Sequence, residues 1–334
     1  MLAGRGVVNG PIACAIDDDI IAAVRQSKAT NRRAMYDISV VRALRRLGED
    51  VRLVTATEPA DRTLRELFEV KPSLVFNLAF SVTPAEPIFA GLLEVLGIPY
   101  TGSGAFAIAL SRDKIRSRQL LQAEGIAVPP FVVLPRRGRP RTIGLAPPYI
   151  VKPNNLANSL GIRAGSVVET YPEVLALADG IWRRFALPSI CDTFIAGREF
   201  QVGLIERRGA FEITAIVELF FAGAPPGRGF KSESVTFQGR RRRVYEVIVR
   251  AARLPRASAA EMGAIARRAA EVLGFRGYAK IDVRMDERGR IFVLEANANP
   301  GLWSGLHVWR RGGFGENLRQ IVAAGRRRAR QEWA

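Results

Sequence analysis

Two stretches near the C-terminus decide the fold: Tyr-Ala-Lys-Ile-Asp-Val-Arg (278–284) and Phe-Val-Leu-Glu-Ala-Asn-Ala-Asn-Pro-Gly (292–301). In each stretch apolar and polar residues alternate, which is the period of a half-buried β-strand. Asp-Glu-Arg-Gly at 286–289 lies between them and has the composition of a tight turn. The two stretches are therefore predicted to form a hairpin, with strands over 278–284 and 291–297, that has one polar face.

The polar face of this hairpin has the composition of a magnesium site. A period of two puts Lys280 and Asp282 on one face of the first strand, and Glu295 and Asn297 together on the second. Magnesium prefers oxygen ligands from one or two carboxylates, completed by water and nucleotide phosphates. We therefore expect Asp282, Glu295 and Asn297 to bind the metal. Lys280 beside them can neutralise a phosphoryl group in transfer.

The first hundred residues alternate short apolar runs with segments of helical spacing. This β-α-β rhythm is typical of a parallel sheet with helices on its faces. We expect a small doubly wound α/β domain that ends near Ser103. The expected strands are 12–16, 51–54 and 74–78, and the expected helices are 32–47 and 88–96.

The rest of the chain mixes helices and strands without that rhythm, so the whole is expected to be α/β and α+β. One helix is predicted over 111–124, opened by a Ser/Asp cap and closed by Gly125. A strand at 149–151 should deliver Lys152 into a flexible segment at 153–161. Further strands are expected at 189–195 and 199–205, and a helix at 259–273. The expected units are an N-terminal domain (1–103), a central unit (104–188) and a C-terminal unit with the metal site (189–334).

The chain of 334 residues carries a net charge of +18, and only six of its 50 basic residues are lysine. Arginine runs at 240–243 and 326–330 are interpreted first as solvated surface and a frayed terminus, and second as a face for anions or nucleic acid. No nucleic-acid-binding motif accompanies them, so nucleic acid is an unlikely partner. No apolar run approaches the roughly 20 residues that span a membrane. With two cysteines and no signal peptide evident, a cytoplasmic location is expected.

Several short motifs, in one order, resemble a known superfamily. The chain is similar to ATP-grasp enzymes, specifically the D-alanine–D-alanine ligase branch, from about Leu74 to Gly305. The resemblance implies the ATP-grasp fold. The motifs are Leu-Gly-Ile-Pro-Tyr-Thr-Gly-Ser-Gly (96–104), Ala-Leu-Ser-Arg-Asp-Lys (109–114), Ile-Val-Lys-Pro (150–153), Phe-Ile-Ala-Gly-Arg-Glu-Phe (194–200), Lys-Ile-Asp-Val (280–283) and Leu-Glu-Ala-Asn-x-x-Pro-Gly (294–301).

The resemblance implies that the protein binds ATP together with two magnesium ions, which Mn²⁺ can replace. It also implies a role in that binding for each matching position. Lys114 and Lys152 match the lysines that hold the α- and β-phosphates, and residues 154–161, with Ser159, match the loop that closes over them. Lys231 matches a lysine near the γ-phosphate, and Gly301 matches a glycine whose N–H faces the developing oxyanion. The adenosine positions are Asp192 for the adenine amino group, Phe194, Ile195 and Leu294 along the adenine, and Glu199 for the ribose hydroxyls.

The lysines support this assignment without any alignment. Four of the six, Lys114, Lys152, Lys231 and Lys280, fall at positions where the resemblance requires a cation beside phosphate. A compact ammonium suits a phosphate in a tight site, whereas the composition elsewhere favours arginine.

These residues imply an ATP-dependent carboxylate–amine ligase that works through an acyl phosphate, so catalysis needs positioning and charge rather than a protein nucleophile. The partners expected are a small carboxylate and a small amine, and the chain is a candidate homodimer. The family's N-terminal Gly-Gly-x-Ser-x-Glu is absent, and residues 79–86 replace its His-Gly segment. Amino-acid or peptide substrates other than D-alanine are therefore expected. The alternatives are an ATP-binding homologue without catalysis, and a cationic nucleic-acid-binding protein.

Overall fold

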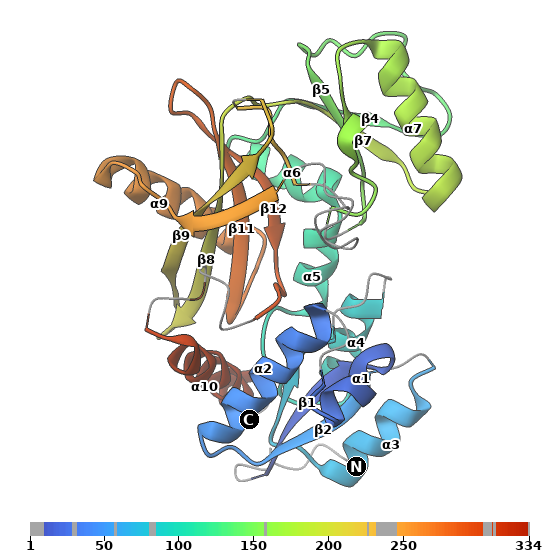
Figure 1. Ribbon diagram of the computed structural model, residues 1–334. Coiled ribbons are helices and arrows are strands. Elements are labelled where there is room, and N and C mark those ends of the chain that lie inside the picture. The colour runs from blue at the N-terminus through green and yellow to red at the C-terminus, as the bar shows by residue number, and fades with distance from the viewer. Residues whose placement is uncertain are drawn as a thin grey trace.

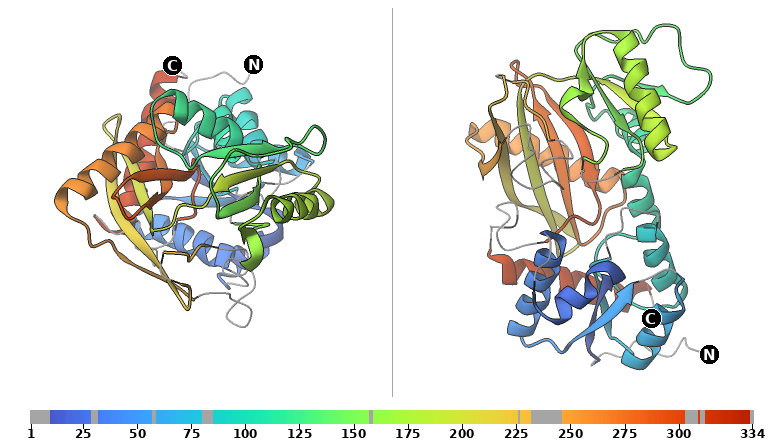
Figure 2. Two further views of the ribbon diagram at one scale, coloured as in Figure 1. Left: turned by 90° about the horizontal axis from the view of Figure 1, so that it is seen from above. Right: turned by 45° about the vertical axis from the view of Figure 1, so that its right-hand side comes forward.

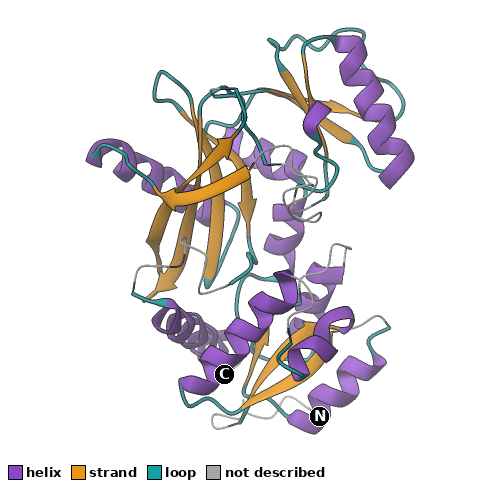
Figure 3. Cartoon of the chain, viewed as in Figure 1, coloured by secondary structure: helices purple, strands orange, loops and turns teal. Residues whose placement is uncertain are grey.

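The computed structural model describes residues 10–28, 32–56, 59–79, 85–156, 159–225, 227–231, 246–302, 309 and 312–332. Three sheets form three lobes, and Figures 1 and 3 show the N-terminal lobe below and the two other lobes above it. Among the described helices, none is long and apolar enough to cross a membrane.

The N-terminal lobe is a parallel sheet in the order β2-β1-β3, as the β-α-β rhythm predicts. Ala13 and Ala15 pack on one face, and Ile12, Cys14 and Ile16 pack on the other. Both faces are thus buried, which a parallel sheet requires. The strands are β1 (Ile12–Asp17), β2 (Val51–Ala56) and β3 (Leu74–Asn77), and the helices are α1 (Asp18–Arg25), α2 (Arg32–Arg46), α3 (Asp61–Val70) and α4 (Ala85–Val95).

Two helices lead out of this lobe where a single helix was predicted over 111–124. Helix α5 spans Ala105–Arg112 and α6 spans Lys114–Ala123. The break falls at Asp113, whose extended backbone ends α5 and whose side chain accepts a hydrogen bond from the Arg116 amide at 3.0 Å. The predicted cap is therefore real, but it lies inside the expected helix and makes Lys114 the first residue of α6.

The central lobe is a four-stranded antiparallel sheet in the order β4-β7-β5-β6, with one helix against it. Strand β7 pairs with β4 and β5. This pairing assigns Ser189–Thr193 to the central lobe, past the boundary expected at residue 188. The elements are β4 (Phe131–Leu134), β5 (Tyr149–Pro153), a 3₁₀ turn (Ala164–Ser166), β6 (Val167–Val168), α7 (Tyr171–Phe185) and β7 (Ser189–Thr193).

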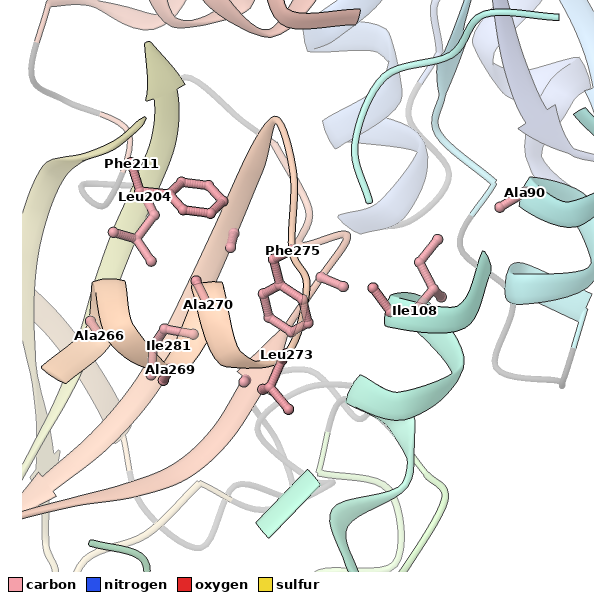
Figure 4. Close-up of a cluster of buried hydrophobic side chains, with 14 of the residues drawn as sticks. Ala90, Ile108, Leu204, Phe211, Ala266, Ala269, Ala270, Leu273, Phe275 and Ile281 are labelled. Atoms are coloured by element: carbon pink, nitrogen blue, oxygen red, sulfur yellow. The ribbon is translucent and has the colours of Figure 1, made fainter. Parts of the chain in front are cut away.

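The C-terminal lobe is an antiparallel sheet in the order β10-β9-β8-β11-β12, which includes the predicted hairpin. Ala279, Ile281 and Val283 are fully buried beneath α9, and Figure 4 shows Ile281 packed against Ala266, Ala269 and Ala270 of that helix. The opposite face of the sheet is left for polar side chains. The elements are β8 (Arg198–Arg207), β9 (Ala210–Ala222), β10 (Glu246–Ala251), α9 (Arg256–Val272), β11 (Tyr278–Met285) and β12 (Ile291–Asn297).

A long helix, α10 (Phe314–Glu332), returns to the N-terminal lobe and packs beside α2 and beneath β8 (Figure 2). Arg326 forms a two-fold ion pair with Glu49 at 2.8 and 3.1 Å. Arg328 donates to the carbonyl oxygen of Gly102 at 2.7 Å. The expectation of a frayed, solvated terminus is therefore wrong for Arg326 and Arg328, which fasten α10 to the N-terminal lobe. The run 240–243 lies outside the described residues.

Candidate active site

The hairpin brings the expected metal-binding side chains to one face. Asp282 is directly opposite Glu295, and Lys280 is opposite Asn297. The Lys280 Nζ lies 2.7 and 2.9 Å from the two Asp282 carboxylate oxygens, and the Asn297 Nδ2 donates to the Lys280 carbonyl at 3.4 Å. A bulge between Asp282 and Val283 ends this regular pairing just beyond the polar face.

All four expected lysines act on Glu295. Burial alone would raise the pKa of this carboxyl, but the charges of Lys114, Lys280, Lys152 and Lys231 outweigh it and hold the pKa below its ordinary value. The nearest lysine, Lys114, lies 3.5 Å from the Glu295 Oε1. Glu295 thus lies among four ammonium groups that come from α6, from β5, from β11 and from the segment at residue 231, an arrangement that suits further negative charge.

Lys114 is held in place by the start of α6 and by the end of strand β5. Its ammonium donates to the carbonyl oxygens of Asn154 and Leu156, the first at 3.3 Å. The Asn154 side chain in turn accepts from the Ile115 amide at 2.9 Å and donates to Asp113 at 3.0 Å. The start of α6 and the end of β5 are therefore tied into one unit that carries the lysine.

Lys152 emerges from β5 and lies against Asp192 of β7, with 2.7 Å between its Nζ and the carboxylate Oδ2. Asp192 is buried and also pairs with Arg118 of α6. Burial would raise the pKa of Asp192, but these two cations hold it below the ordinary value. Because both cations already engage the carboxylate, the geometry favours Asp192 as the residue that positions Lys152 rather than as the adenine acceptor expected from the sequence.

The expected adenosine contacts line one pocket between the central and C-terminal lobes. The Phe194 ring lies 4.5 Å from the Arg284 guanidinium, and the backbone amide of Phe194 donates to the Pro148 carbonyl at 2.7 Å. Burial raises the pKa of Glu199, opposed by Arg284. The enclosed volume is about 80 Å³, below the roughly 300 Å³ at which ligand pockets begin. The residues lining the pocket include Lys114, Lys152, Ser159, Asp192, Phe194, Ile195, Glu199, Lys231, Asp282, Leu294 and Glu295.

Ser159 and Lys231 reach this pocket from loops, whereas Gly301 lies outside its lining. Ser159 has a positive φ of 59°, the left-handed conformation of a tight turn. Burial, then the charge of Lys280, lowers the pKa of Lys231. Gly301 faces the Tyr36 ring of α2, where a Cβ atom would approach within 2.9 Å. Close packing against Tyr36 therefore explains why a glycine is needed at this position. The oxyanion role expected for Gly301 stays a prediction.

The sequence interpretation missed two arginines that build the site. Arg118 is fully buried, pairs with Asp192 and donates to the Leu294 carbonyl at 2.9 Å, so it joins α6 to β7 and β12. Its position four residues after Lys114, on the same helix face, is the signal that could have found it. Arg284, two residues after Asp282 and so on the same face of the strand, was given no role, and its guanidinium lies over the Phe194 ring.

The donor set on the hairpin fits magnesium. It comprises two carboxylates and one amide oxygen, with no histidine or cysteine, and the described residues contain no cluster of three or more His, Cys, Asp or Glu side chains. Magnesium commonly takes one or two protein carboxylates and completes its octahedron with water and phosphate. The residues present suit a metal that arrives with a nucleotide.

Comparison with known proteins agrees with this geometry. The family model described as "D-ala D-ala ligase C-terminus" matches residues 120–310. A D-alanine–D-alanine ligase of Bordetella petrii is 31% identical over 281 residues, covering 82% of this chain and 81% of the relative. Another, from Geobacter sulfurreducens, is 36% identical over 217 residues, covering 64% of this chain and 62% of the relative.

Solved structures show the same fold. A D-alanine–D-alanine ligase from Bacillus anthracis, crystallised with ATP, superposes with a TM-score of 0.76 at 17% identity, covering 97% of this chain and 100% of that one. The VanG D-Ala:D-Ser ligase of Enterococcus faecalis superposes with a TM-score of 0.72 at 16% identity, covering 95% and 100%. Such low identities establish the fold alone, but the Bordetella match extends over most of both chains. With an oxygen-ligand hairpin ringed by lysines and a family match over more than half its length, the chain belongs to the D-alanine–D-alanine ligase family of ATP-grasp carbon–nitrogen ligases.

Proposed function

We propose that the chain joins the carboxylate of one substrate to the amine of another through an acyl phosphate formed with ATP, and that both are amino-acid or peptide substrates other than D-alanine. The observation that carries this proposal is the convergence of Lys114, Lys152, Lys231 and Lys280 on Glu295. Together with Arg118 and Arg284, these lysines give six cations against the four carboxylates of Glu295, Asp282, Asp192 and Glu199, and a nucleotide triphosphate would balance the excess of positive charge. The family's carbon–nitrogen bond formation sets the reaction class.

The residues divide the work by position. Lys114 and Lys152 hold the phosphates nearest the nucleoside, while Lys231 and Lys280 neutralise charge on the γ-phosphoryl group as a substrate carboxylate attacks it. Asp282, Glu295 and Asn297 would hold magnesium, which adds positive charge at the β- and γ-phosphates. The incoming amine then attacks the carbonyl carbon and inorganic phosphate leaves.

The small volume of the pocket implies movement before nucleotide enters. Leu156, Ser159 and Ile162 line it from the segment that follows β5, and Phe230 and Lys231 line it from the other side. These five residues lie outside the regular helices and strands that the structure describes. Opening of these two segments would admit ATP, and their closure would shelter the acyl phosphate from water.

Beside the nucleotide pocket, the proposed substrate side of the site is a small cavity that contains a buried acid, Glu86. Glu86 is buried and pairs with Arg112 at 2.8 Å, and a small cavity joins this pair to Glu295, Asn297 and Asn299. Burial raises the pKa of Glu86, and Arg112 opposes that rise. We propose that Glu86 receives the ammonium of an amino-acid substrate. Glu86 lies on α4, and the family's N-terminal Gly-Gly-x-Ser-x-Glu stretch is absent from this chain, which supports a substrate other than D-alanine.

A mass-spectrometric substrate screen tests the proposal. The protein, ATP and magnesium would be incubated with pooled amino acids and dipeptides, and both phosphate release and product mass would be measured. We expect an amide product with stoichiometric ADP and phosphate, and little D-alanyl-D-alanine. Rapid formation of D-alanyl-D-alanine would contradict the specificity, and absence of any amide product with ATP bound would contradict ligation of these substrates.

A further inference from the structure

Arg284 of β11 brings a guanidinium group into the wall of the nucleotide pocket. The residue is 3% exposed and lines the pocket together with Glu199 and Phe194. Its Nε has no hydrogen-bond partner in the part of the chain that the structure describes. A buried donor without an acceptor costs free energy, so a pocket that contains one is suited to a ligand that supplies the acceptor.

Other contacts of this guanidinium fix its position. Its Cζ lies 4.5 Å from the centre of the Phe194 ring, and its Nη2 donates to the Gly229 carbonyl oxygen. The segment of Gly229 is itself closely packed. A Cβ atom at Gly229 would come within 2.3 Å of Phe221, and the ring of Phe230 meets Phe194 edge-on with 6.2 Å between their centres. The Nε donor is therefore held in one place in the pocket wall.

An acceptor lies close to this donor but does not bind it directly. Glu199 is opposite Arg284 on the neighbouring strand β8. The distance from the Arg284 Nε to the Glu199 Oε2 is 3.9 Å, which is too long for a hydrogen bond. Glu199 is also buried, at 8% exposure. The two side chains thus present a donor and an acceptor to the same part of the pocket.

The chemistry of this pair limits what can bridge it. A single bridging atom must accept from the Nε–H of Arg284 and donate to the carboxylate of Glu199. Ionised phosphate oxygens and the ring nitrogens of adenine only accept, and the adenine amino group only donates, whereas a hydroxyl does both. An oxygen about 2.8 Å from each of the two atoms makes ordinary hydrogen bonds to both. Within a nucleotide, the ribose hydroxyls are the groups that fit.

We propose that Arg284 determines the selectivity for the sugar of the nucleotide: its Nε donates to one ribose hydroxyl, which in turn donates to Glu199. The sequence interpretation gave the ribose contact to Glu199 alone. Arg284 adds a second, charged partner that a nucleotide without that hydroxyl leaves unpaired. This inference rests on the proposed function, because it takes the pocket to be the nucleotide site.

Equilibrium binding of ADP and of 2′,3′-dideoxy-ADP tests the proposal in the full-length protein, with magnesium and without turnover. Calorimetry gives both dissociation constants, and their ratio measures the selectivity for the sugar. We expect the wild type to bind ADP more tightly by about 100-fold, because the analogue leaves both Arg284 and Glu199 without a hydroxyl. The affinities of 2′-deoxy-ADP and 3′-deoxy-ADP then show which hydroxyl is bound.

Arg284→Lys is the decisive variant, because lysine has a methylene where arginine has Nε and still places a cation near the position of Cζ. The charge beside Glu199 is kept and the donor is lost, so the selectivity should fall about tenfold, the worth of one hydrogen bond to a charged group. Arg284→Met, without donor or charge, should lose at least as much. Arg290→Met is the matched control and should keep the wild-type selectivity. Arg290 also lies over a phenylalanine ring, 5.6 Å from Phe292, and pairs with Asp286, but it is outside the pocket lining.

Four results would overturn the assignment. Equal binding of ADP and the dideoxy analogue by the wild type would mean that no ribose hydroxyl bridges the pair. Wild-type selectivity in both Arg284 variants would leave Glu199 alone as the sugar contact, and selectivity kept by lysine but lost by methionine would show that the charge acts and Nε does not. A wild type that binds no ADP would contradict the proposed function itself, and the inference with it. Melting curves check the fold of each variant, and if Arg284→Met does not fold, Arg284→Lys, which keeps the charge, decides.

Discussion

Glu295 is one carboxylate among four ammonium groups, so its charge supports the fold as well as the proposed metal site. A carboxyl group whose pKa is lower in the folded protein than in the unfolded chain stabilises the fold at any pH above its ordinary pKa. This stabilisation is lost as the pH falls through the pKa of the folded state. Glu295→Gln should therefore lower the melting temperature of the nucleotide-free protein at neutral pH. ATP should restore much of the loss, because phosphates then balance the lysines.

The same substitution separates binding from chemistry. Turnover should fall by about 100-fold or more, because a metal supplies several kcal/mol to the transition state, while ATP affinity should fall much less. Melting curves, calorimetry and phosphate release on one variant suffice. Near-normal turnover would place the metal elsewhere.

Lys152 gives nucleotide binding a pH dependence. Burial, then the charge of Arg118, lowers its pKa to about 8, although Asp192 opposes them. The Lys152 ammonium loses its proton as the pH rises through that value, so ATP should bind more weakly above pH 8. Binding of ATP in that range should be accompanied by uptake of a proton by Lys152. Calorimetry in buffers of different ionisation enthalpy measures the proton directly.

Lys152→Arg is the control for this effect, because a guanidinium stays charged over the whole range. The arginine variant should bind ATP with a flat profile between pH 7 and pH 9, whatever its absolute affinity. A wild-type profile equally flat would show that the ammonium does not lose its proton there.

Alternation along the two hairpin strands was enough to predict that Asp282 and Glu295 share a face, whereas the register that sets them opposite each other depends on the turn between the strands. The resemblance placed four lysines beside phosphate, and the rarity of lysine in this chain supported that placement. Arg118 was missed for the opposite reason: one arginine among 44 carries no compositional signal, and its burial depends on Asp192, far away in sequence.

At the level of elements, the break between α5 and α6 sets the position of Lys114. Asp113 caps α6, and its Oδ1 accepts from both the Arg116 amide and the Asn154 side chain at 3.0 Å. Asp113→Ala should destabilise the protein by about 1 kcal/mol, the usual cost of a lost cap. It should also raise the KM for ATP, because the Asn154 side chain then keeps, at the helix start, only its bond from the Ile115 amide and holds that start less firmly.

Asp113→Asn separates the two effects, since its amide oxygen still accepts from the Arg116 amide. It should recover most of the stability and most of the KM. Thermal melting and steady-state kinetics on both variants check this. An Asp113→Ala protein with unchanged KM would show that the cap does not position Lys114.

The three strands of the N-terminal lobe and its helices α2 and α4 could be predicted because each forms one apolar run or stripe, whereas α1 and α3 were not among the expected elements. Helix α10 could not, because its arginine-rich sequence has the composition of a solvated tail. Its arginines are satisfied by Glu49 and by the carbonyls of Gly102 and Tyr100, contacts that only the tertiary structure creates.

Across the whole molecule, Gly325 marks how closely α10 lies against the N-terminal sheet. A Cβ atom there would come within 2.9 Å of the Leu74 Cδ1 and 3.3 Å of the Tyr100 carbonyl. Glycine to alanine in a helix interior ordinarily stabilises by about 0.5–1 kcal/mol. At Gly325 the clash should reverse the sign and lower the melting temperature.

Gly180, in the middle of α7, is the matched control, because a Cβ atom there meets nothing within 4 Å. Gly180→Ala should raise stability where Gly325→Ala lowers it, as denaturant unfolding of both variants would show. Stabilisation by both would mean that the contact between α10 and the sheet is looser than described.

The packing of α10 also bears on the order in which the protein is made. One face of the N-terminal sheet, with Leu74 and Ile12, is buried in part by Leu318, Ile321 and Val322 of α10. During synthesis the strands leave the ribosome early, while the helix that completes their cover is translated after the other two lobes. The nascent N-terminal lobe therefore carries an unfinished apolar face through most of elongation, and chaperone binding at the ribosome should concentrate on that face until residues 314–332 emerge.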